Sequence, residues 1–140
     1  MASGYMTKLQ GYVYEGGLTN GAGVPVPNGT IMVQSGDKLV MPAADSGTKF
    51  VCIELTDIYG EIGFRFVVDS LAKRYYFVEN GMDDFNDMAE YDNRNYVTKD
   101  GELLRAHPLL VGEEFIVSGS SASQYTVGTA YSLKADGTIG

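Results

Sequence analysis

The sequence is poor in the two residue types that most often bind metals or act as a nucleophile and its base. It has one cysteine and one histidine, which excludes an internal disulfide and a zinc site built from Cys and His alone. Cys52 lies in the apolar run 50–53, so we expect a small buried side chain. His107 precedes Pro108, which favours an extended backbone, so we expect a histidine in a loop or at a strand edge. No cofactor is expected.

Basic residues and long apolar segments are also scarce. With 10 basic against 18 acidic residues the formal net charge is −8, which argues against nucleic acid and anionic membranes as partners. No apolar stretch approaches the roughly 20 residues of a membrane-spanning helix. The first residues lack the charged and apolar regions of a signal peptide. We therefore expect a protein made in a cytoplasm, whose acidity keeps it soluble.

Two polar stretches have the composition of functional motifs but not their defining residues. The acidic cluster in 82–95 lacks the spacing of an EF-hand loop, so we interpret it as solvated surface; its members are Asp83, Asp84, Asp87 and Glu90. The glycine-rich stretch 16–23 has no Gly-Lys-Ser/Thr and precedes no predicted helix, which argues against a phosphate-binding loop. An enzyme would have to use His107 with the acidic cluster, and this is the weakest of the functional alternatives considered below. Our prediction is that the protein is not an enzyme.

What the sequence does contain is typical of a β protein. It has 18 Gly, 10 Tyr and 6 Phe spread over short segments, which favours brief strands joined by tight turns. At 140 residues it has the size of one domain, with an expected folded surface of roughly 7,000 Å². We predict an extended N-terminal arm and loop, residues 1–23, followed by one β-rich domain, residues 24–140. The domain is expected to be a small barrel or sandwich of about eight short strands.

The clearest strand is 61–69, where Ile62, Phe64, Phe66 and Val68 recur with period two and predict one buried face. The run 50–55, which is apolar except for Glu54, predicts a strand covered on both faces or at a sandwich centre. The remaining predicted elements are a hairpin of 30–34 and 38–41, a strand at 75–79, at most one short helix near 83–91, a hairpin of 96–99 and 102–105, and strands at 114–117, 124–127 and 131–133.

Tyrosine is the most unusual enrichment. Tyr5, Tyr12 and Tyr14 flank the N-terminal segment, and tyrosine suits interfaces because it buries a large area while keeping a polar tip. Packing of the same side chains on their own domain is the alternative.

Three stretches resemble the small decoration, or cement, proteins of tailed-phage heads. They are Pro27-Asn28-Gly29-Thr30-Ile31-Met32-Val33, the segment 106–117 (AHPLLVGEEFIV) and the segment 127–139 (VGTAYSLKADGTI). The resemblance implies a β-rich knob with an N-terminal arm that binds the outer surface of the major capsid protein lattice, stabilises the head and has no active site. It implies a virion location, with copies of the protein itself as a second partner to consider. By this analogy the capsid contacts are Tyr5, Met6, Leu9, Tyr12 and Tyr14.

A function of another class stays open beside this one. The chain is also compatible with a carbohydrate- or receptor-binding β module of a phage head fibre or tail, which would use tyrosines and acidic residues on loops for sugar contacts.

Overall fold

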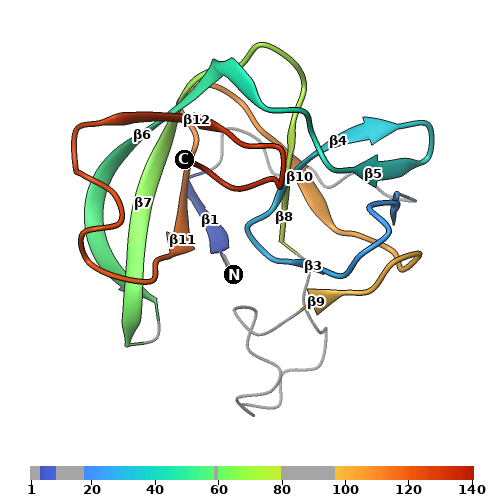
Figure 1. The fold of residues 1–140 in the computed structure, drawn as a ribbon, viewed down its shortest axis with the longest axis horizontal. Helices are drawn as coiled ribbons and strands as arrows, with labels where there is room; N and C mark the ends of the chain where they lie inside the picture. The colour runs from blue at the N-terminus through green and yellow to red at the C-terminus, as the bar shows by residue number, and fades with distance from the viewer. Residues whose placement is uncertain (1–3, 9–17, 59, 80–96) are drawn as a thin grey trace.

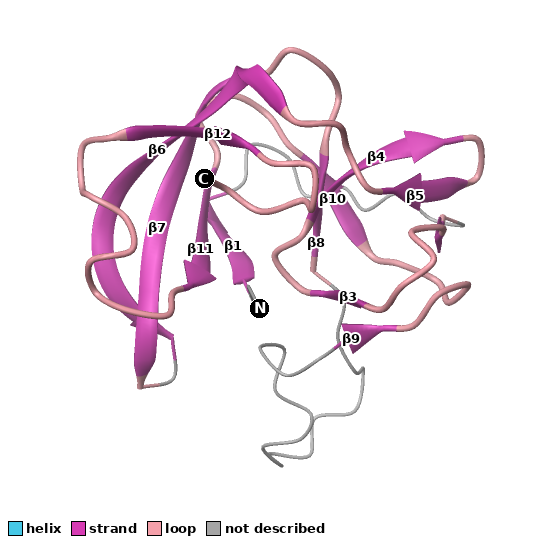
Figure 2. Cartoon of the chain, in the orientation of Figure 1, coloured by secondary structure: helices cyan, strands magenta, loops and turns pink. Residues whose placement is uncertain are grey.

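The computed structural model describes residues 4–8, 18–58, 60–79 and 97–140. This part of the chain forms 12 strands and no helix (Figure 1 and Figure 2). The predicted class, a mostly β protein with a small barrel or sandwich, is therefore confirmed. The segment considered for a short helix, 83–91, and the acidic cluster lie outside the described residues. In the part that is described, no helix is long and apolar enough to cross a membrane.

The strands form two five-stranded sheets and one two-stranded sheet. The first sheet has the order β1-β11-β7-β6-β12, the second has the order β10-β8-β4-β5-β2, and β3 pairs with β9. The strands are β1 (Gly4–Lys8), β2 (Thr19–Asn20), β3 (Val26–Pro27), β4 (Ile31–Ser35), β5 (Lys38–Val40), β6 (Asp45–Ile58), β7 (Glu61–Ser70), β8 (Tyr76–Val78), β9 (Val97–Thr98), β10 (Ala106–Pro108), β11 (Glu114–Ser118) and β12 (Ala130–Leu133).

The first sheet is built around the long antiparallel hairpin of β6 and β7, which have 14 and 10 residues. Gly60, in the turn, has a φ of 84°, a backbone conformation that glycine adopts at little cost. The register of β6 shifts between Lys49 and Phe50 and again between Cys52 and Glu54. Such bulges bend a strand and increase its twist, and the sheet accordingly curls around its inner face (Figure 1).

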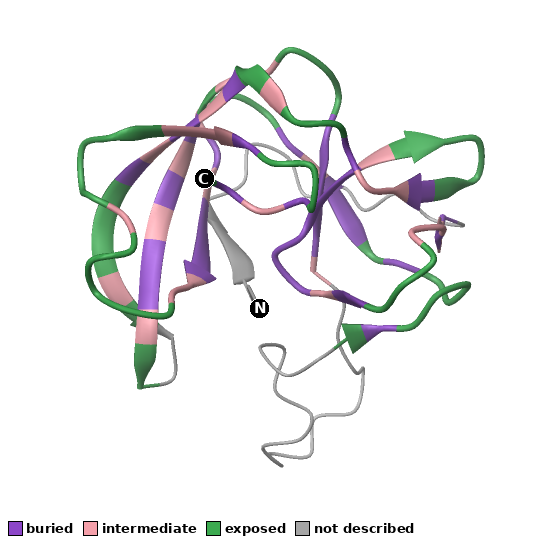
Figure 3. Ribbon diagram, viewed as in Figure 1, coloured by how far each residue is buried: buried purple, intermediate pink, exposed green. Residues whose placement is uncertain are grey.

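The inner face of this sheet carries the main hydrophobic core. Along β7, buried and partly exposed positions alternate (Figure 3), and Phe64, Phe66 and Val68 are buried as the period-two pattern predicts. Cys52 is fully buried, which confirms its predicted role as a small apolar side chain. The buried members of the cluster are Ile31, Phe50, Cys52, Phe64, Phe66, Val68, Tyr75, Phe77, Leu109, Phe115, Val117, Leu133 and Ile139.

The prediction that residues 50–55 form a core strand, covered on both faces or at a sandwich centre, holds for Phe50 and Cys52 but is wrong for the second half of the segment. Phe50 and Cys52 are fully buried, but Ile53 and Leu55 are 38% and 47% exposed. The cause is the bulge after Cys52: it inserts Ile53 into the strand without a partner on β7, and the strand beyond it leaves the core. An apolar run interrupted only by Glu54 does not reveal such a change of direction.

The second sheet contains the predicted hairpin of β4 and β5, with Gly36 in its turn at a φ of 64°. Its β2 pairs with β5 in parallel. A second hydrophobic cluster lies on this side of the molecule and consists of Leu18, Val26, Met32, Leu39, Tyr76, Val78, Leu104 and Ala106. Residues 18–23 therefore belong to the packed body, since Leu18 and Asn20 are 5% and 1% exposed.

Two predicted elements near the C-terminal half do not form. The Asp100-Gly101 turn is present, but β9 pairs with β3, and Leu103 bridges to Thr19, so 96–105 is not a hairpin. Residues 124–127 form turns, not a strand; Gln124 N–H donates to the carbonyl of Ser121 at 3.2 Å. In the first place contacts with distant segments satisfy the backbone groups that a hairpin would have used, whereas in the second local turn hydrogen bonds do so.

Candidate functional site at the N-terminal edge strand

The N-terminal segment enters the structure as β1, an extended strand that pairs antiparallel with β11. In the register, Tyr5 stands opposite Ile116 and Met6 opposite Phe115. Among the described strands, β1 is the last in its sheet. The other three predicted capsid contacts, Leu9, Tyr12 and Tyr14, lie outside the described residues. The two predicted residues that the structure does locate are therefore consecutive positions of an edge strand.

The strand β11, with which β1 pairs, is packed into the main hydrophobic core. Phe115 is fully buried and its ring centroid lies 4.7 Å from that of Phe77 and 5.7 Å from that of Phe50. Ile116 is also buried but belongs to neither core cluster, because alternate residues of β11 point to opposite faces of the sheet. β1 is thus held by a strand with apolar side chains on both faces.

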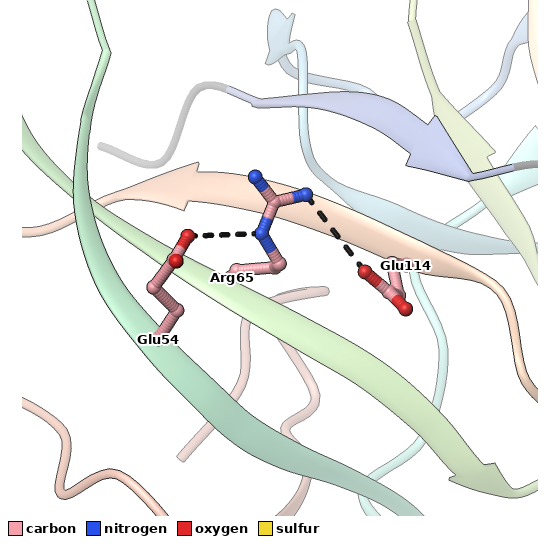
Figure 4. A network of polar contacts seen from close by, with 3 residues as sticks. All are labelled: Glu54, Arg65 and Glu114. Carbon is pink, nitrogen blue, oxygen red and sulfur yellow. Dashed lines mark hydrogen bonds and ion pairs between the residues drawn. The ribbon is translucent and has the colours of Figure 1, made fainter.

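Charged side chains line the outer face of the same sheet. Arg65 on β7 lies between Glu54 on β6 and Glu114 on β11 (Figure 4). Its Nε is 3.1 Å from Glu54 Oε1, and one terminal nitrogen is 3.8 Å from Glu114 Oε1. The three side chains keep a substantial part of their surface in water, so each pair contributes at most about 1 kcal/mol. The group carries one negative charge in excess.

Apolar surface lies beside these charges. Val51 pairs with Val67 in the register of β6 and β7, and both side chains are half-buried. Exposed Ile53 marks the bulge on the same hairpin. This outer sheet face therefore combines half-buried valines with charges and borders the edge strand β1.

His107 occupies β10, the last described strand of the second sheet, which confirms the prediction of a strand-edge histidine. Its Nε2 is 2.8 Å from Glu113 Oε2, and Glu113 Oε1 accepts a hydrogen bond from the Leu110 N–H at 2.7 Å. Both residues are at most 1% exposed. Solvent does not reach this pair, so its role is to hold the loop between β10 and β11. The sequence offered no signal for it, because nothing in the spacing of the two residues indicates a turn that brings them together.

A second polar network pins the start of β6. The Tyr75 hydroxyl and the Thr48 hydroxyl both donate to Asp45 Oδ2, the latter at 2.9 Å, and the Gly47 N–H donates to Oδ1 at 2.9 Å. The hydrogen bond from Tyr75 is the main cause that lowers the pKa of Asp45. Burial, and then that same bond, raise the pKa of Tyr75 to about 12. At neutral pH Asp45 is therefore a carboxylate and Tyr75 a neutral phenol that donates to it. The role of this pair is to hold the start of β6 in place.

Metal ligation has no support in residues 4–8, 18–58, 60–79 and 97–140, where no three His, Cys, Asp or Glu side chains gather. The geometry therefore directs attention to the edge strand and the outer face of its sheet. In comparisons with known proteins, no family model, curated protein or solved structure matches this chain significantly.

Proposed function

We propose that this protein is a decoration protein of a tailed-phage head, which binds the outer surface of the major capsid protein lattice and stabilises the shell. Its N-terminal segment is the part that makes the contact, through Tyr5, Met6, Leu9, Tyr12 and Tyr14. The protein is made in the host cytoplasm and acts on the exterior of the virion.

The observation that carries the proposal is the position of β1. An edge strand presents backbone N–H and C=O groups on one side, and a partner's extended segment can add to it as a further strand. Tyr5 and Met6 lie on this strand, and the chain continues from it directly into the segment that contains the other three residues. The resemblance of residues 27–33, 106–117 and 127–139 to decoration proteins supports the same assignment.

The lattice explains how a small contact suffices. A capsid offers many identical sites, so each contact can be modest while the stabilisation summed over the shell is large. The formal net charge of −8 keeps free copies apart from one another until the lattice orders them.

The test is co-sedimentation with expanded phage heads assembled without the protein. The full-length chain is expected to bind at a fixed number of copies per capsomer. A variant without residues 1–14 is expected to stay in the supernatant, and so is the full-length variant Tyr5→Ala, Tyr12→Ala, Tyr14→Ala. Leu103→Ala is the control, because Leu103 is an exposed side chain far along the chain, next to β2.

Circular dichroism and thermal melting must show that each variant is folded. The triple substitution guards against loss of β1 unfolding the domain, since it leaves the backbone of the strand in place. Undiminished binding of both folded variants would overturn the assignment of the contact to the N-terminal segment. Failure of the full-length protein to bind heads would overturn the proposed function.

A further inference from the structure

Two turns enclose a polar pocket at one end of the first sheet. Its volume is about 340 Å³, within the range of small-molecule sites. One side is the end of β11 and the turn that follows it, with Ser118, Ser120 and Gln124, and the other is the turn that follows β12, with Lys134 and Thr138. Tyr125 and Ile139 complete the lining.

Tyr125 gives the pocket a rigid aromatic floor. Its ring packs edge-on against Phe64, Phe66 and Tyr131, each with a centroid distance of 5.0 Å. Its hydroxyl donates to the carbonyl of Ile139 at 2.7 Å. Burial raises the pKa of Tyr125, so the phenol stays neutral. The floor is therefore held by the main core and does not need to be ordered by a ligand.

The first wall is fixed by a side chain that folds back on its own turn. Gln124 Oε1 accepts hydrogen bonds from the Ser120 N–H at 2.6 Å and the Ser120 hydroxyl at 3.0 Å. Gly119 lies so close to the core that an added Cβ would be 2.4 Å from the ring of Phe64. The backbone can approach the ring this closely only because the residue is glycine.

The second wall places a cation beside these polar groups. The Lys134 N–H donates to the carbonyl of Thr138 at 2.9 Å, which closes the turn. Asp136 is engaged by the Thr138 N–H at 3.0 Å and by the hydroxyl of the same residue, and this hydroxyl is the main cause that lowers its pKa. The charge of Asp136 already interacts with the Lys134 ammonium, which contributes to the lowered pKa of Asp136, but within the described part of the chain the Lys134 ammonium makes no direct ion pair. It is the one charged side chain of the lining.

We propose that this pocket binds a sugar unit that carries a carboxylate, such as a uronic acid. The Lys134 ammonium pairs with the carboxylate, the serine, threonine and glutamine groups exchange hydrogen bonds with sugar hydroxyls, and Tyr125 with Ile139 supplies apolar surface for the ring. A nucleotide or another polyphosphate needs several cations, and the lining provides one. This site is separate from the capsid-contact proposal and does not depend on it.

The first test is an NMR titration of the isotope-labelled full-length protein with glucuronate, glucose and acetate. Glucuronate is expected to bind saturably, with the largest shift changes in residues 118–125 and 134–139. Glucose is expected to bind about two- to fivefold more weakly, which is the contribution of one exposed ion pair. Acetate is expected to cause no saturable change, because it lacks the ring and the hydroxyls.

Paired substitutions make the result specific. Lys134→Met keeps an apolar stem against Gly140 and removes the charge. The affinity of this variant for glucuronate should therefore fall to its affinity for glucose. Lys99→Met removes the same charge from an exposed turn elsewhere and should leave the affinity unchanged. Thr138→Ala should lower the affinity for both glucuronate and glucose. The full-length variant Tyr5→Ala, Tyr12→Ala, Tyr14→Ala should bind glucuronate as tightly as the wild-type protein, whatever the three substitutions do to capsid binding.

Three results would overturn the proposal. They are the absence of saturable shifts with glucuronate, acetate binding as tightly as glucuronate, and an equal loss of affinity in Lys99→Met and Lys134→Met. Equal affinity for glucose and glucuronate would overturn the assignment of Lys134 to a carboxylate.

Discussion

At the scale of single residues, Asn20 connects the beginning of the packed body to a segment about eighty positions further along the chain. Its side-chain nitrogen donates to the carbonyls of Val24 and Thr98 at 2.9 and 3.0 Å, and its side-chain oxygen accepts from the Ala22 N–H at 2.9 Å. Asn20 is 1% exposed, so no water replaces these partners without a rearrangement. A buried amide that satisfies three backbone groups is costly to remove.

We expect Asn20→Ala to lower the free energy of unfolding by about 2–4 kcal/mol, because three backbone groups lose their partner. Urea denaturation measures this change. Asn20→Asp is the informative companion: it keeps the acceptor for Ala22 but loses both donors and places a carboxylate against two carbonyls, so it should be at least as destabilising at pH 7. If Asn20→Ala unfolds at the wild-type midpoint, the amide does not connect the two segments.

The Tyr75 and Asp45 pair predicts a pH dependence of stability with a defined sign. Because the pKa of folded Tyr75 is raised from 10.0 to about 12, its contribution is present below pH 10 and is lost as the pH rises toward 12. Because the pKa of folded Asp45 is lowered, its contribution is present above the usual value of 3.8 and is lost as the pH falls below that.

Tyr75→Phe removes the phenol and should abolish the Tyr75 share of the alkaline destabilisation between pH 10 and 12, while that of Tyr125 remains and the pKa of Asp45 moves up toward its usual value. Denaturation midpoints against pH measure the first effect, and carboxyl NMR titration measures the second. Tyr131→Phe is the control. An unchanged Asp45 titration in Tyr75→Phe would show that the hydrogen bond does not hold the carboxylate.

At the scale of elements, the loop between β10 and β11 illustrates how a buried ionisable pair positions backbone. Glu113 accepts from the Leu110 N–H and contacts His107, while its own carbonyl accepts from the Val68 N–H at 2.9 Å. The loop therefore spans both five-stranded sheets, since β10 lies in one and β11 in the other. Its exposed tip presents Leu110 and Val111 to solvent.

Removing one member of this pair should cost more than replacing it by a similar group. We expect His107→Ala to destabilise the fold by about 3–5 kcal/mol, because it leaves a buried carboxylate without this partner. Glu113→Gln should cost less, since an amide oxygen can still accept from the Leu110 N–H and the side chain can still contact the His107 ring. Chemical denaturation and hydrogen exchange of the Leu110 amide measure both effects. Equal stabilities for the two variants would mean that the pair does not fix the loop.

Across the whole molecule, the two five-stranded sheets share one main core. The N-terminal strand β1 lies at one edge of the first sheet. The surface of 7,033 Å² agrees with the roughly 7,000 Å² expected from the chain length. The first sheet, with the turns that leave it, contains all three surface features discussed above. These are the edge strand β1, the outer face with Glu54, Arg65 and Glu114, and the pocket beside Lys134. The second sheet carries the second hydrophobic cluster and is joined to β11 by the loop after β10.

The amino-acid pattern was sufficient wherever neighbouring residues decide the structure. The period-two pattern of 61–69, the β4–β5 hairpin around Gly36 and the buried Cys52 follow from side-chain alternation and turn chemistry. Tyr5 and Met6 stay predicted contacts, and their place on an edge strand depends on pairing with β11, more than a hundred residues away.

What the sequence determined alone is the β class, the strands with clear alternation and the scarcity of catalytic and metal-binding residue types. The tertiary structure decided which strands pair, that β9 joins β3, that the β6 bulge exposes Ile53, and that His107 meets Glu113. The physical reason is that alternation and turn residues act over a few positions, whereas strand partners and buried polar pairs are selected by competition among distant backbone and side-chain groups that only the folded chain brings together.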